Sequence, residues 1–165
     1  MKNIVTNMGF LVIVGALMGL GGTVAMDIWA FVLSKFGVAP FPNWAMPGRW
    51  FAHVFRGRIF HNDIGALAPV RGELALGWFL HYGVGILYGI IFVLLAGVVW
   101  IGKPDFLTVW IFSLITIAAG WFLLQPGMGL GWAASKTPNP MKVRCFGLVA
   151  HTVFALGMWL VALAF

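Results

Sequence analysis

The most informative segment of this chain is ELALGWFLHYGVGILYG, residues 73–89. Small or polar residues recur in it at every fourth position: Glu73, Gly77, His81, Gly85 and Gly89. Residues four apart lie on one helix face, so the spacing predicts a membrane helix on which another backbone or a flat ligand can come close. The ionisable His81 in this face is therefore a candidate functional residue.

The composition of the whole chain is that of an integral membrane protein. Of its 165 residues, 62% are hydrophobic and only 8% are charged, whereas soluble domains average about 25% charged residues. Each span takes about 20 residues, so residues 1–165 accommodate a single integral membrane domain. The lone Cys145 excludes an intrachain disulfide framework.

Four apolar segments, at about 9–36, 77–101, 105–125 and 143–165, are each long enough to cross a bilayer. The turn at 102–105 makes the second and third spans an antiparallel hairpin, so the loops 37–76 and 126–142 lie on one side. The predicted fold is all-α, a transmembrane four-helix bundle. The first apolar run continues past Ala25 through Leu33, as in a retained span rather than a cleaved leader.

Basic residues predict which side these loops face. Two of them, Lys2 and Lys103, fall on the side of the termini. The other eight fall on the side of the long loops: Lys35, Arg49, Arg56, Arg58, Arg71, Lys136, Lys142 and Arg144. This bias predicts cytoplasmic loops and both termini outside the cytoplasm. The net charge of +6 thus reflects topology and not nucleic-acid binding.

The long loop contains a segment, about 49–60, that predicts an amphipathic interfacial helix on the cytoplasmic side. Its basic and aromatic residues are expected to meet lipid headgroups and the acyl boundary. The expected lipid-facing residues are Arg49, Trp50, Arg56 and Arg58. Gly57 weakens a helix interior, so the helix is expected to end near it.

Polar residues inside the spans are the candidate site. Asp27 follows Gly15, Gly19 and Thr23 at four-residue spacing, which places its carboxylate on a packing face. Burial of a carboxylate there costs about 2.5 to 3.5 kcal/mol, so it must be paired, protonated or functional. The candidate ligand-binding or proton-relay residues are Asp27, Glu73, His81, Gln125 and His151.

A short internal similarity suggests duplication. The segment GWFLHY, residues 77–82, aligns with GLVAHT, residues 147–152. A two-plus-two parallel repeat would place His81 and His151 in equivalent positions facing a common axis.

Three functions fit this pattern. The first is a small transporter or accessory subunit that binds a ligand, protons or a metal ion through the polar residues. The second is electron transfer, with His81 and His151 as the two ligands of a haem b. The third is a structural subunit that packs in a larger complex. Hydrolase motifs are missing from the sequence, so an enzyme is not expected.

Taken in order, a set of short motifs resembles a family of small bacterial multi-pass membrane proteins catalogued as a domain of unknown function, number 2938. The motifs are Ala25-Met26-Asp27, Gly48-Arg49-Trp50, His61 with Ile64, Gly72-Glu73, Gly77-Trp78, His81-Tyr82, Gln125-Pro126 with Gly129 and Gly131, Thr137-Pro138-Asn139-Pro140, and His151 with Phe154. The resemblance covers nearly the whole chain and implies a bacterial cytoplasmic membrane, without an activity or a cofactor. The chain departs from the family pattern at Ala155, where a glycine is expected. Expected partners are membrane lipid and a second copy or a larger membrane complex.

Overall fold

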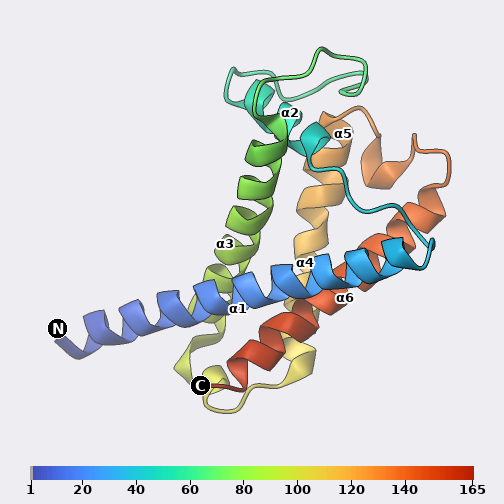
Figure 1. Cartoon of the computed structure of the whole chain (residues 1–165). Helices are drawn as coiled ribbons and strands as arrows, with labels where there is room; N and C mark the ends of the chain where they lie inside the picture. Colours follow the sequence, from blue (N-terminus) through green and yellow to red (C-terminus); the bar gives the residue numbers. More distant parts are fainter. Residues whose placement is uncertain (1) are drawn as a thin grey trace.

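The computed structural model describes residues 2–165, with side chains described from Met8 onward. The described residues form helices and loops without strands (Figure 1). The elements are α1 (Lys2–Lys35), α2 (Ala45–Val54), α3 (Glu73–Ile101), α4 (Phe106–Ala119), a π-helical turn η1 (Gly120–Leu124), α5 (Gln125–Gly127), a 3-10 turn η2 (Trp132–Ala134) and α6 (Pro140–Ala162).

Four helical segments are long and apolar enough to cross a membrane, as the sequence predicted. They are Met8–Lys35, Glu73–Ile101, Phe106–Gly127 and Pro140–Ala162. The second and fourth begin three or four residues earlier than expected, for local reasons. Gly72 takes a left-handed conformation (φ 79°) directly before α3, and the side chain of Asn139 accepts the backbone N–H of Lys142 at the start of α6.

Helix α1 crosses α3 at glycines of both helices (Figure 1). A Cβ on Gly15 would lie 2.6 Å from Cα of Ile90, and Gly19 likewise lies against the backbone of Gly85. The sequence left open whether these glycine faces serve internal packing or association between copies. Their contacts with each other assign them to internal packing.

Helix α6 packs against α1 and α4 and completes the core. Gly157 lies against the backbone of α1, where an added Cβ would be 2.7 Å from the carbonyl oxygen of Gly21. Val14, Met18, Phe92, Val109 and Met158 are among the buried residues of the cluster where these helices meet.

Helices α3 and α4 are consecutive but make little direct contact. Gly97 interrupts α3 with φ 74° and ψ 179°, so the last turn of the helix changes direction before the tight turn to α4. Asp105 then starts α4 by accepting the backbone N–H of Thr108 at 2.8 Å. Farther along, the π-helical turn interrupts the regular α-helix of the third span.

The loop helix differs from the expected one. It covers Ala45–Val54 instead of 49–60, because Gly57 at φ 79° stops it early. Its start is packed on α3, where Gly48 touches the backbone of Glu73. Arg49 and Trp50 are 7% and 4% exposed, so the expectation that they face lipid is wrong. Arg56 and Arg58 are exposed.

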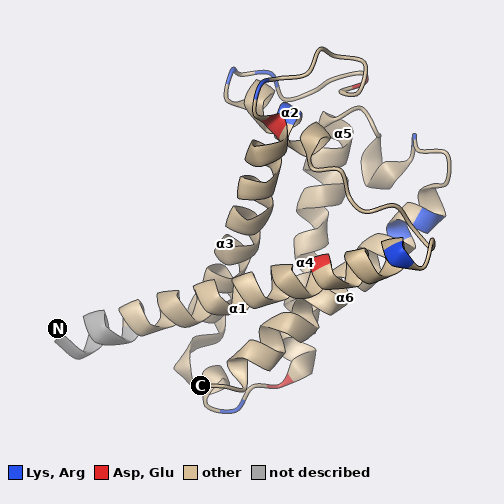
Figure 2. Ribbon diagram, in the orientation of Figure 1, with Lys and Arg blue, Asp and Glu red and all other residues tan. Residues whose placement is uncertain are grey.

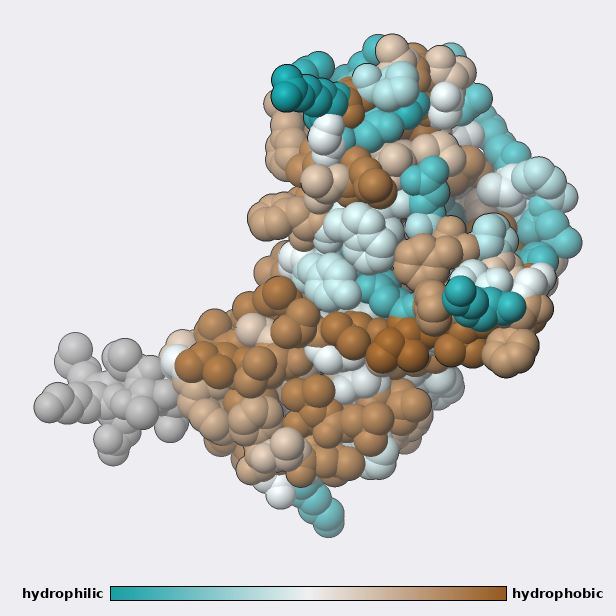
Figure 3. Space-filling model, viewed as in Figure 1, coloured by the Kyte–Doolittle hydropathy of each residue, from teal (hydrophilic) through white to brown (hydrophobic). Residues whose placement is uncertain are grey.

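Charge and hydropathy divide the molecule along its length. Figure 2 shows lysines and arginines at the α2 end and where α1 ends and α6 begins, while the α3–α4 turn carries Lys103. Lys2 is one of the two basic residues expected on the side of the termini, and its side chain lies outside the described residues. Figure 3 shows hydrophobic side chains over α1 and the part of the bundle below it, and hydrophilic ones around α2.

Candidate functional site

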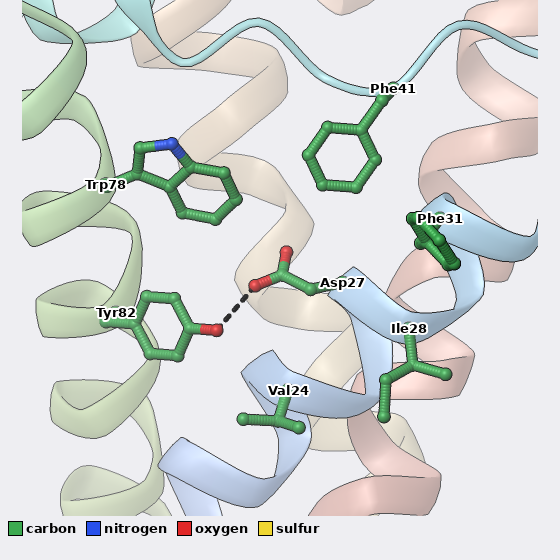
Figure 4. A pocket seen from close by; sticks show the side chains of 7 residues that line it. All are labelled: Val24, Asp27, Ile28, Phe31, Phe41, Trp78 and Tyr82. Atoms are coloured by element: carbon green, nitrogen blue, oxygen red, sulfur yellow. Dashed lines mark hydrogen bonds between the residues drawn. The ribbon is translucent and has the colours of Figure 1, made fainter. Parts of the chain in front are cut away.

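The crossing of α1 and α3 brings Asp27 to two neighbouring residues of α3. Its Oδ2 accepts the Tyr82 hydroxyl at 2.7 Å (Figure 4), and its Oδ1 lies 3.1 Å from Nε2 of His81. The side chains of His81 and Asp27 are 9% and 17% exposed. A carboxylate oxygen accepts, so His81 donates through Nε2–H and its Nδ1 is left as the acceptor nitrogen. Asp27 is therefore paired, which is one of the three states expected for a carboxylate at this position.

Aromatic rings fix the orientation of His81. Its ring stacks on Trp44, with centroids 3.9 Å apart and planes 23° apart. Trp78 meets the same imidazole edge-on at 5.9 Å. Trp44 precedes α2, so the loop helix and α3 together hold the imidazole in place.

His81 also lines a cavity of about 370 Å³. Residues of α1, α3, α4, the π-helical turn η1 and α6 line it, together with Trp44 and residues of α2 that include Trp50. Most of its lining is apolar or aromatic. Its polar lining residues include His81, His151, Thr23, Thr116 and Tyr88. A mostly apolar cavity with a few polar groups is the usual form of a small-molecule site.

His151 is oriented from α4. Its Nδ1 lies 2.9 Å from the carbonyl oxygen of Ser113 and 3.2 Å from Oγ1 of Thr116. The Thr116 hydroxyl already donates to the same carbonyl at 2.7 Å. A carbonyl only accepts, so Nδ1 of His151 carries the proton in this arrangement and Nε2 is the acceptor nitrogen. Each histidine thus bonds to the preceding span, but through different nitrogens: Nε2 of His81 bonds to a side chain, and Nδ1 of His151 bonds to a backbone carbonyl.

Glu73 belongs to a different cluster. Its carboxylate binds Arg49 in a two-pronged ion pair, with Nε–Oε2 and Nη2–Oε1 distances of 2.8 Å, and it also accepts the N–H of Val70. The hydrogen bonds that Arg49 donates to Glu73 raise the pKa of Arg49. Arg49 in turn donates Nη1–H to the carbonyls of Ile64 and Leu67. This ion pair connects Glu73 to α2 and to the loop before α3.

Gln125 also stands apart from the Asp27–His81 pair. Its Oε1 is buried and has no hydrogen-bond partner among the described residues. It begins α5, directly after the π-helical turn, and does not line the cavity. Of the five predicted site residues, the structure therefore joins Asp27 to His81 and places His151 on the wall of the same cavity as His81.

These positions bear on the metal and haem hypotheses. In the described part of the chain, no three His, Cys, Asp or Glu side chains converge closely enough to hold a metal ion, so Asp27, Glu73, His81 and His151 do not form one ligand set. A haem axial ligand commonly leaves Nδ1–H bonded to the protein and offers Nε2. His151 fits this pattern, but Nε2 of His81 is held by Asp27. The pair therefore does not offer two matching ligands.

A second histidine pair was not predicted as a site. Nδ1 of His53 on α2 lies 2.9 Å from Nε2 of His61, and Nδ1 of His61 lies 3.0 Å from the carbonyl oxygen of Gly127. His61 must donate to that carbonyl, so its Nε2 accepts a proton donated by His53. The pair connects α2 to the end of the third span. Its two residues are 8 apart in sequence, and α2 ends between them, so helical periodicity does not relate them.

We expect this histidine pair to make the fold sensitive to acid. Burial, followed by the charges of His61 and of Arg58, lowers the pKa of His53 below its ordinary 6.5. The unfolded chain therefore binds more protons there, so stability is complete above pH 6.5 and falls as the pH drops through the folded-state pKa. The measurement is the SDS concentration that half-unfolds the protein in mixed micelles at pH 7.5 and 5.5. His53→Gln keeps a donor for His61 and should reduce the difference between the two pH values. An equal difference in both proteins would contradict the prediction.

Tyr82 and Trp44 were also missed as site residues. Tyr82 follows His81 directly, so its side chain leaves the helix about 100° around the axis from that of His81. Helical spacing therefore does not predict that both side chains contact the same carboxylate. Trp44 lies in a proline-containing segment without periodicity. Both become neighbours of the site only when α1 and the loop are placed against α3.

Comparisons with known proteins place the chain in one family. Neither the curated proteins nor the solved structures include a significant match. Residues 16–165, which contain all five predicted site residues, match the family described as "Protein of unknown function (DUF2938)", and the chain therefore belongs to this family.

Proposed function

We propose that this protein binds a small, mostly apolar molecule that carries a hydrogen-bond acceptor, in the cavity between α3 and α4. It acts as a carrier or accessory subunit of the bacterial cytoplasmic membrane and not as an enzyme. The observation that carries the proposal is the apolar cavity of about 370 Å³ with His81 and His151 on its wall. A cavity of this size within a membrane bundle suits a small organic ligand.

The polar groups of the cavity support this class of ligand. The indole Nε1 of Trp44 is buried without a hydrogen-bond partner among the described residues. Buried donors are ordinarily paired, so a ligand with an acceptor atom would satisfy it. Nδ1 of His81 and Nε2 of His151 are two acceptor nitrogens that make no hydrogen bond within the described residues, so they suit a ligand that carries a donor as well as an acceptor.

The bond between Asp27 and His81 supports a link between binding and protonation. His81 touches the cavity, whereas Asp27 lines a groove on the outer face of α1 and α3. A proton that moves between them would change the charge on the cavity wall. The bias of basic residues toward one end supports an orientation with α2 in the cytoplasm and both termini outside.

Filling the cavity tests the proposal. A Cβ on Gly120 would meet no atom within 4 Å, and Gly120 lines the cavity, so Gly120→Leu should occupy the ligand's space and leave the helix intact. Overpacking costs about 1–3 kcal/mol, so we expect the affinity for the ligand to fall by about five- to 150-fold and its retention to fall with it. The protein is purified into nanodiscs, and small molecules retained by it are extracted and quantified by mass spectrometry.

Gly83→Leu is the matched control. A Cβ on Gly83 would likewise meet no atom within 4 Å, but Gly83 is exposed on α3 and does not line the cavity. We expect one compound to be retained by the wild type and by Gly83→Leu but not by Gly120→Leu. If the three proteins retain the same compounds, the cavity is not a ligand site and the proposal fails.

A further inference from the structure

A second hollow lies on the outer side of the Asp27–His81 pair and is separate from the cavity. It is a groove of about 420 Å³ between α1, α3 and the loop before α2. Its wall contains four aromatic rings around one carboxylate: Phe31, Phe41, Trp78, Tyr82 and Asp27 (Figure 4). We propose that this groove binds an amphiphilic organic cation, with its quaternary ammonium or phosphonium centre beside Asp27 and its apolar part along α1.

The charge of the groove favours a cation. Asp27 is the only charged residue among the seven that line it. The two groups that donate to its carboxylate, the Tyr82 hydroxyl and the His81 Nε2–H, can do so in their neutral forms. No lysine or arginine side chain of the lining neutralises the carboxylate. A cation in the groove would place an opposite charge at short range from Asp27.

The aromatic rings favour an organic cation over an inorganic one. The rings of Phe41 and Trp78 are stacked with centroids 6.1 Å apart, and Tyr82 lies 6.2 Å from Trp78. Their faces attract a poorly hydrated cation, as in the aromatic cages that bind quaternary ammonium groups. Lys35 shows this attraction nearby, since its Nζ lies 5.2 Å from the centre of the Phe31 ring.

The depth of the groove favours a free amphiphile over a lipid headgroup. Asp27 is eight residues before Lys35, which ends α1, so it lies about 12 Å along the helix from that end. A phospholipid keeps its phosphate at the interface and would have to carry its amine deeper than its phosphate to reach Asp27. The neighbouring Val24 and Ile28 are 39% and 59% exposed. They offer apolar surface to the hydrophobic part of a free cation.

The test uses tetraphenylphosphonium as the probe. The full-length protein is reconstituted in nanodiscs of phosphatidylglycerol, and binding of the labelled probe is measured by equilibrium dialysis against empty nanodiscs. We expect saturable binding of one probe per protein. Asp27→Asn keeps the shape of the side chain but removes its charge, and it should weaken binding at least about tenfold. Phe41→Leu removes one ring face from a loop position and should weaken binding roughly threefold.

Asp105→Asn is the matched control, because Asp105 is a carboxylate at the opposite end of α3 that caps α4 and does not touch the groove. It should bind the probe as the wild type does. Equal binding by Asp27→Asn and wild type, or uptake of the probe that never saturates, would overturn the proposal. If Asp27→Asn does not fold, the smaller effect of Phe41→Leu decides, and no effect there overturns the proposal.

Lipid is distinguished in the same experiment. Nanodiscs that contain phosphatidylethanolamine should leave probe binding unchanged. If this lipid abolishes binding and is retained by the protein in native mass spectrometry, the occupant is a lipid headgroup and the inference of a free cation is wrong. Gly120 does not line the groove, so Gly120→Leu should bind the probe normally. The outcome here is therefore independent of the cavity experiment.

Discussion

Replacement of Arg49 by methionine is expected to destabilise the protein by about 3–5 kcal/mol, because it leaves the buried carboxylate of Glu73 without its counter-charge. The two side chains are only 8% and 12% exposed and are joined by two hydrogen bonds of 2.8 Å. The same change removes the donor to the carbonyls of Ile64 and Leu67. The loop 55–72 and the start of α3 should lose their fixed arrangement. The measurement is reversible unfolding by SDS in mixed micelles at neutral pH.

Two variants separate the ion pair from general effects of losing a positive charge. Arg56→Met removes an exposed arginine of the same loop and should change stability by less than about 0.5 kcal/mol. The double variant Arg49→Met with Glu73→Leu removes both charges, so it should be less destabilised than the sum of the two single variants by about 1–3 kcal/mol. Additive effects of the two changes would show that the residues do not interact.

Replacement of Gly19 by alanine is expected to separate α1 from α3 and to cost about 3 kcal/mol or more, the upper end of overpacking effects. The added Cβ would overlap the carbonyl oxygen of Gly85 and lie 2.8 Å from Cα of Ile86. Both obstacles are backbone atoms of α3, so they can move only if the two helices move apart. The Asp27–His81 bond depends on the same crossing and should weaken with it.

Gly9→Ala is the control on the same helix. A Cβ on Gly9 would have no atom within 4 Å, and alanine favours a helix over glycine by about 1 kcal/mol. This variant should be as stable as the wild type or slightly more stable in the same SDS titration. If Gly19→Ala unfolds at the same SDS concentration as Gly9→Ala, the described crossing of α1 and α3 is incorrect.

The fold class followed from local signals. The hydropathy of about 20 consecutive residues indicates a span without any information about the elements packed against it. The four predicted apolar segments therefore agree with the helices of the structure to within a few residues. The four-residue spacing of Gly15, Gly19, Thr23 and Asp27 also predicted a packing face correctly, because a stripe of small residues indicates that another element comes close. This spacing does not indicate which helix packs against that face.

Arg49 shows why the sequence pattern wrongly predicted a lipid-facing side chain in the loop helix. The amphipathic pattern separates a polar from an apolar face, and the polar face of a membrane-surface helix ordinarily meets headgroups and water. Here the polar face meets a buried carboxylate 24 residues away in sequence. Periodicity within the helix contains no information about that carboxylate.

Residues close together in the chain suffice to predict an all-α membrane protein with four helices long and apolar enough to span a bilayer, and to place Asp27, His81 and His151 in them. The pairing of Asp27 with His81 and Tyr82, the pairing of Glu73 with Arg49 and the hold of α4 on His151 emerge only when the helices are packed together. These pairings depend on where the helices cross. The crossings are set by contacts between glycines far apart in sequence, such as Gly19 and Gly85, and by the interruptions of α3 and the third span.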